Sequence, residues 1–107
     1  MVIEERHNVV AVSGALTRSQ WPIIRTTAFL VYERIGSGVI IDFSGVRWLS
    51  SAGESTLIDA MNEIERCRLP FTILTVSNSA AALLSDSVAR RLTFGTERWW
   101  SRMWGTE

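Results

Sequence analysis

The sequence contains no lysine, one cysteine and one histidine among its 107 residues. With Cys67 alone, no intramolecular disulfide can form, and a metal site would depend on His7 and carboxylates. The longest apolar runs, FLVY, VII and AAALL, are far shorter than the roughly 20 residues that cross a bilayer, so we expect no membrane insertion. The first ten residues hold two glutamates and no apolar run of signal-peptide length, which predicts a cytoplasmic protein.

Neither charge sign dominates, because eleven arginines balance eleven acidic residues. A chain without net charge has no field to concentrate a polyanion, so we expect no nucleic-acid partner. The use of arginine alone suits bidentate pairing with carboxylates and phosphates. A GC-rich genome explains the same bias, and we favour that interpretation.

Short apolar runs indicate the strands. We predict a hairpin from residues 2–5 and 9–13 around a turn at His7, a buried central strand over 38–44 and a further strand over 69–76. Together with the helices below, the order is strand, strand, helix, strand, helix, strand, helix. This order predicts an α/β fold: a mixed β-sheet of about four to five strands with parallel central strands, and about four helices packed against it.

The helices are predicted from periodicity and from capping residues. The first spans about 20–35, with Thr17 or Ser19 as its N-cap and glycine after its end. The second spans 52–68, and one or two short helices are expected within 80–92. For the first helix we predict a core-facing stripe of Ile23, Thr26, Thr27, Leu30 and Arg34.

The length predicts one domain, which we place at residues 1–95, followed by an aromatic extension at 96–107. If the extension is helical, four large side chains share one side of it: Trp99, Trp100, Met103 and Trp104. One interpretation is that this segment folds back over the sheet or first helix. The other is a second interface, either for a homodimer or for another protein, since such residues are enriched in interface cores.

The junction SSAG, between the central strand and the second helix, is the strongest candidate site. Its glycines fit neither a phosphate loop nor a dinucleotide-binding fingerprint, and a serine nucleophile lacks a neighbouring histidine. Ser51 and Glu54 satisfy a capping-box pattern. Asp42, upstream, is spaced to accept backbone N–H bonds in a turn. The helix N-terminus would also tolerate a phosphate on Ser50 or Ser51.

The order of elements and the string DFSGVRWLSSAG resemble the STAS domain, the sulfate-transporter and anti-sigma-factor-antagonist family. VSGAL before the first helix and SVARRLTFG near the end also resemble the family's segments. The residues that match the family string are Asp42, Ser44, Val46, Leu49, Ser51 and Gly53. The resemblance covers about residues 2–95 and implies a non-enzymatic binding module.

Three residues depart from that pattern at the site. Ala52 stands where antagonists of this family carry the serine phosphorylated by a partner kinase, Ser50 replaces the usual acidic residue, and Glu54 replaces an apolar one. The phosphorylation switch is thus missing or displaced by one residue, with Ser51 the first candidate acceptor and Ser50 the second. A branch of the family that serves lipid-transport ABC complexes carries its functional hydroxyl at the position of Ser51.

The resemblance therefore implies a regulatory, anti-sigma-factor-antagonist-like module that needs no cofactor and sequesters a kinase-type anti-sigma factor. Its predicted contact residues are Trp48, Ser50, Ser51, Ala52, Gly53 and Glu54. The first alternative is an accessory subunit that contacts the ATPase of an ABC transporter. The second is a small nucleotide-binding α/β protein.

Overall fold

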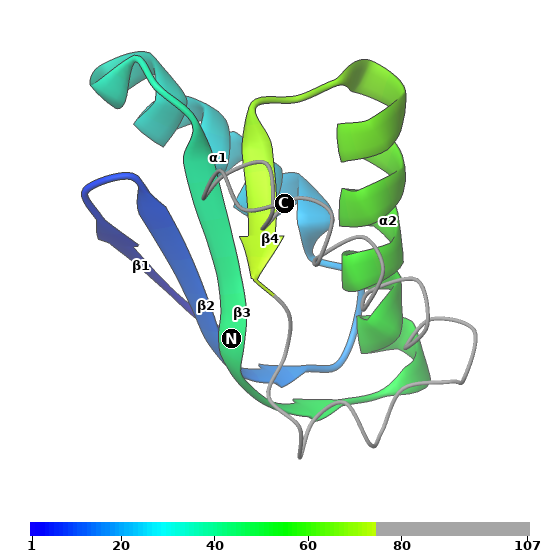
Figure 1. Ribbon diagram of the computed structural model, residues 1–107. Helices are drawn as coiled ribbons and strands as arrows, with labels where there is room; N and C mark the ends of the chain where they lie inside the picture. Colours follow the sequence, from blue (N-terminus) through cyan, green and yellow to red (C-terminus); the bar gives the residue numbers. More distant parts are fainter. Residues whose placement is uncertain (75–107) are drawn as a thin grey trace, which may run out of the picture.

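The computed structural model describes residues 1–74, where four strands form one mixed sheet with two helices. The elements in chain order are β1 (Val2–Arg6), β2 (Val9–Leu16), α1 (Trp21–Ile35), β3 (Val39–Leu49), α2 (Ser51–Cys67) and β4 (Phe71–Leu74). β1 pairs antiparallel with β2, whereas β2, β3 and β4 are parallel (Figure 1). The predicted α/β class with parallel central strands is confirmed, and the expected helices within 80–92 lie outside the described residues.

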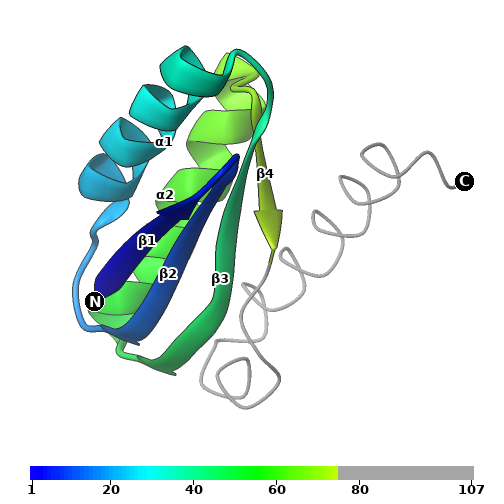
Figure 2. The same ribbon diagram turned by 90° about the vertical axis from the view of Figure 1, so that its left-hand side faces the viewer.

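Both helices cover the same face of the sheet, side by side (Figure 2). The strand order is β1-β2-β3-β4, so the two crossovers through α1 and α2 advance in the same direction. Right-handed crossovers that advance the same way place their helices on one face. Alternate residues of the strands point into this layer, among them Val10, Val12, Ile41, Phe43 and Ile73, all fully buried. No helix within residues 1–74 has the length and hydropathy that spanning a bilayer requires.

The β1–β2 hairpin is confirmed, with a two-residue turn at His7 and Asn8 in which His7 has φ of 52°. β2 runs to Leu16 rather than ending near Ser13. Beyond the predicted end, the chain continues pairing with β3 through a left-handed φ of 89° at Gly14. A glycine takes that conformation at little cost.

The predicted core-facing stripe of α1 is wrong. The buried residues of α1 are Trp21, Ile24, Ala28 and Val31, whereas Ile23 and Leu30 are 56% and 57% exposed. The sequence misled because the apolar residues of this helix surround most of its circumference, so several stripes fit equally well. The predicted C-terminal cap is confirmed at Gly36, whose N–H donates to the Tyr32 carbonyl.

The predicted N-caps of α1, Thr17 and Ser19, are also wrong. Gln20 occupies the N-cap position and no side chain caps the helix. The backbone N–H of Gln20 donates instead to the Thr56 hydroxyl of α2 at 2.9 Å. Tertiary contacts with α2 thus replace the local cap.

Candidate functional site

The candidate site lies where β3 ends and α2 begins, at the carboxyl ends of the parallel strands. β3 extends to Leu49, five residues past the predicted end at Ser44. Its register with β2 shifts twice, between Asp42 and Gly45 and again between Val46 and Trp48, where β3 carries the extra residues. Such bulges bend a strand, and Figure 1 shows the last parts of β2 and β3 turning toward the first turn of α2.

Asp42 stabilises the first bulge. Its carboxylate Oδ1 accepts the backbone N–H of Ser44 at 2.8 Å. The expected bond from an aspartate to a nearby backbone N–H is therefore present, although it lies within a strand instead of a loop. Gly45 is needed beside it, because a Cβ there would lie 2.9 Å from the Cβ of Ser13.

A single residue, Ser50, connects β3 to α2. Its N–H donates to the Leu16 carbonyl at 3.0 Å, and its hydroxyl oxygen accepts the Gly53 N–H at 3.0 Å. Ser50 is thus the N-cap, and the predicted capping box of Ser51 with Glu54 is wrong. The helix starts one residue earlier than expected because the Leu16 carbonyl holds Ser50 in the extended conformation of an N-cap.

Gly53 is buried against the end of β2. A Cβ at this position would lie 1.8 Å from the Leu16 carbonyl oxygen and 2.4 Å from its carbonyl carbon. Only glycine lets the first turn of α2 approach β2 this closely. Gly53, one of the predicted contact residues, thus has a structural role inside the fold.

Three of the predicted contact residues are exposed around this anchored junction. Trp48 is 50% exposed, so it is not a core tryptophan, and Ser51 and Ala52 in the first turn of α2 are also exposed. Ser50 and Glu54 are half-buried. The exposed set of Trp48, Ser51 and Ala52 is called the junction surface below.

The sequence did not reveal how α2 holds the segment before α1. Thr56, fully buried, donates from its hydroxyl to the Arg18 carbonyl at 3.2 Å while accepting from Gln20. The Ser19 hydroxyl donates to Asp59 at 3.0 Å. The sequence did hold one indication of these bonds: Thr56 lies on the apolar face of an amphipathic helix. A buried polar side chain is nearly always hydrogen-bonded, so a partner for Thr56 could have been expected.

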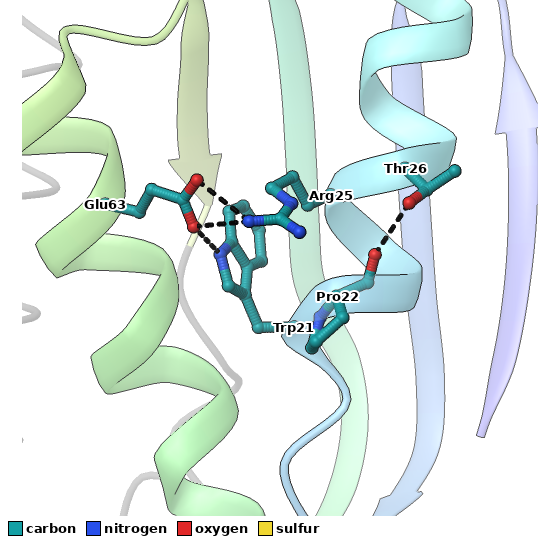
Figure 3. A network of polar contacts seen from close by, with 5 residues as sticks. All are labelled: Trp21, Pro22, Arg25, Thr26 and Glu63. Carbon is teal, nitrogen blue, oxygen red and sulfur yellow. Dashed lines mark hydrogen bonds and ion pairs between the residues drawn. The ribbon is translucent and has the colours of Figure 1, made fainter.

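Further along, Glu63 joins the two helices (Figure 3). Its carboxylate accepts the indole N–H of Trp21 at 2.6 Å and pairs with the Arg25 guanidinium at 3.0 Å. The bond from Trp21, followed by Arg25, lowers the pKa of Glu63 against the opposing effect of desolvation. This network fixes α2 against α1.

The junction surface carries no residues arranged for acid-base or nucleophilic chemistry. His7 lies in the β1–β2 turn, and β2 separates it from Leu16 and Ser50 by about 25 Å. Within residues 1–74, no three side chains of histidine, cysteine, aspartate or glutamate gather as metal ligands.

The tail residues Trp99, Trp100, Met103 and Trp104 lie outside the described part of the chain.

No family model, curated protein or solved structure matches this chain.

Proposed function

We propose that this protein is a regulatory binding module of the STAS type that sequesters a kinase-type anti-sigma factor through the junction surface. The order of elements in residues 1–74 and the position of DFSGVRWLSSAG, which spans the end of β3 and the start of α2, support the proposal. The observation that carries it is that Trp48 is half-exposed near the end of β3, three residues before Ser51, and that Ser51 and Ala52 at the start of α2 are exposed as well.

Hydrogen bonds and strand pairing within this chain hold the backbone of the junction surface in place without a partner. Ser50 is bonded to Leu16 and to Gly53, and the second bulge positions Trp48 opposite Ala15. A rigid surface loses little conformational entropy on binding. Exposed tryptophans are also the residues that most often contribute a large share of the binding energy in protein interfaces.

Of the two serines, Ser51 is the better phosphate acceptor. Its side chain is exposed at the first position of α2, whereas the Ser50 hydroxyl is half-buried and already accepts a hydrogen bond. A phosphate on Ser51 would add about two negative charges near the positive end of the helix dipole. The same charges would repel an acidic partner surface, which gives a mechanism for release.

The test has two parts: titration calorimetry of an anti-sigma kinase from the same genome into the full chain without ATP, and a separate incubation of the two proteins with ATP followed by mass spectrometry. We expect a complex with the kinase, a phosphate on Ser51 in wild type, and none in Ser51→Ala. Ser50→Ala should still be phosphorylated. Absence of both binding and phosphate would contradict the proposal. Binding without phosphate would mean that the module sequesters the kinase but that phosphorylation does not release it.

A second candidate is an accessory subunit of an ABC transporter. The sequence places alanine at the family's phosphoserine position and a hydroxyl one residue earlier, as in that branch. Ser51 and Glu54 are three residues apart on α2, so one partner can contact both. Co-purification of a transport ATPase in place of an anti-sigma kinase would favour this candidate.

A further inference from the structure

The second bulge of β3 turns two consecutive side chains away from the core. Arg47 is its extra residue, because the residues before and after it pair with consecutive residues of β2. In a regular strand, successive side chains point to opposite faces. Here Val46 and Leu49 are buried, whereas Arg47 and Trp48 between them are both exposed. The bulge therefore exposes a guanidinium and an indole at adjacent positions of one strand.

The guanidinium of Arg47 has no carboxylate partner within residues 1–74. Three arginines form the ion pairs of this part of the chain: Arg6, Arg25 and Arg34. Arg47 takes part in none of these pairs. An arginine side chain can donate two parallel hydrogen bonds to one carboxylate. Arg47 is therefore available to pair with an acidic group that another molecule supplies.

Trp48 adds an apolar surface next to this charge. The side chain is 50% exposed, and its pairing partner on β2 is Ala15, which is also exposed. The side chain of an alanine is too small to cover an indole ring. Tryptophan and arginine are also enriched among the residues that dominate the binding energy of protein interfaces. The two side chains together suit a segment that combines a carboxylate with an apolar side chain.

We propose that the partner of the junction surface docks an acidic segment on Arg47 and Trp48, with a carboxylate on the guanidinium and an apolar side chain on the indole. This inference rests on the proposed function of the site and adds the chemistry of the partner. Release by a phosphate on Ser51 requires an acidic partner surface, because only like charges repel. The proposal supplies that surface.

A single-stranded nucleic acid would also offer negative charge and a ring to stack on the indole. Such sites follow the phosphate backbone with a positively charged groove. Arg47 is the only basic residue within 39–54, and the whole chain has no net charge. One guanidinium is suited to a carboxylate and not to a row of phosphates, so the observations favour a protein segment.

The first test uses the full chain without the kinase. Isotope-labelled protein is titrated with a short peptide of alternating glutamate and leucine, and separately with a matched peptide of lysine and leucine, while amide and indole resonances are followed by NMR. We expect the Trp48 resonances to shift with the glutamate peptide only, and the shift to disappear in Arg47→Glu. No shift with the glutamate peptide, equal shifts with both peptides, or a response only to single-stranded RNA would overturn the proposal.

Arg68→Glu is the matched control, because it changes the net charge by the same amount. Arg68 is the C-cap of α2, about 25 Å along the helix from Ser51. This variant should respond to the glutamate peptide like wild type. Far-UV circular dichroism verifies that each variant remains folded.

The second test is titration calorimetry with the anti-sigma kinase. Arg47→Glu should raise the dissociation constant at least about fivefold, and added salt should reduce this difference, since exposed ion pairs are screened. Equal affinities of wild type and Arg47→Glu would overturn the acidic-segment proposal and leave the proposed function standing. If the kinase does not bind wild type, the proposed function fails, and the peptide titration alone decides whether Arg47 and Trp48 bind an acidic segment.

Discussion

Replacing Gly53 by alanine should destabilise the folded protein, because the first turn of α2 packs closely against the end of β2. The new Cβ would lie 1.8 Å from the Leu16 carbonyl oxygen, whereas carbon and oxygen atoms in contact are about 3.3 Å apart. The first turn of α2 must therefore move by about 1.5 Å. Overpacking of this kind costs about 1–3 kcal/mol, and weakening the bond from Ser50 to Leu16 costs about 1 kcal/mol more.

Alanine also has a better helix propensity than glycine, which offsets about 1 kcal/mol. The net expectation for Gly53→Ala is a loss of about 2 kcal/mol in the free energy of unfolding, or about 8 °C in Tm. Urea unfolding followed by far-UV circular dichroism measures it. Gly38→Ala is the control, because a Cβ there meets only the Pro70 carbonyl oxygen at 3.6 Å and stability should hold or rise slightly. A Gly53→Ala protein as stable as wild type would refute the internal-contact explanation.

Three further predictions test the same structure. Ser50→Ala should cost about 1 kcal/mol by removing the N-cap, while Ser51→Ala should cost less than about 0.5 kcal/mol; equal losses in calorimetric unfolding would contradict the cap assignment. Asp42→Ala should cost about 1–2 kcal/mol in urea unfolding, because the Ser44 N–H at the bulge loses its acceptor. The lowered pKa of Glu63 means that its contribution to stability is present above the ordinary glutamate pKa and is lost as the pH falls through the folded pKa. Glu63→Gln should thus flatten the decline in Tm on acidification, and an unchanged decline would show that Glu63 is not involved.

The sequence predicted the parts of the fold that depend on runs and periodicity. The buried run of β3 and the three- and four-residue spacing of α2 placed both elements, and the hairpin turn at His7 was found from its residue types. The start of α2 was predicted at residue 52 and lies at Ser51. These features are local, so a single sequence contains them.

The errors concern features that tertiary contacts decide. Ser50 became the cap because the Leu16 carbonyl, distant in sequence, fixes its backbone. Leu30 and Ile23 are exposed because α2 and β1 flank α1 on particular sides, which the pattern of a broadly apolar helix does not specify. The role of Gly53 likewise depends on the path of β2. The place of SSAG at the connection between a strand and a helix was predictable, but which of its residues are exposed and which are structural was not.

The most direct measurement of the proposed function is titration calorimetry of the anti-sigma kinase into the full chain and into Trp48→Ala. We predict binding by wild type and a dissociation constant raised at least about tenfold by Trp48→Ala. Tyr32→Ala, which removes another exposed aromatic side chain from α1, should bind like wild type. Equal affinities of wild type and Trp48→Ala, or no binding by wild type, would contradict the assignment of the junction surface as the partner-binding site.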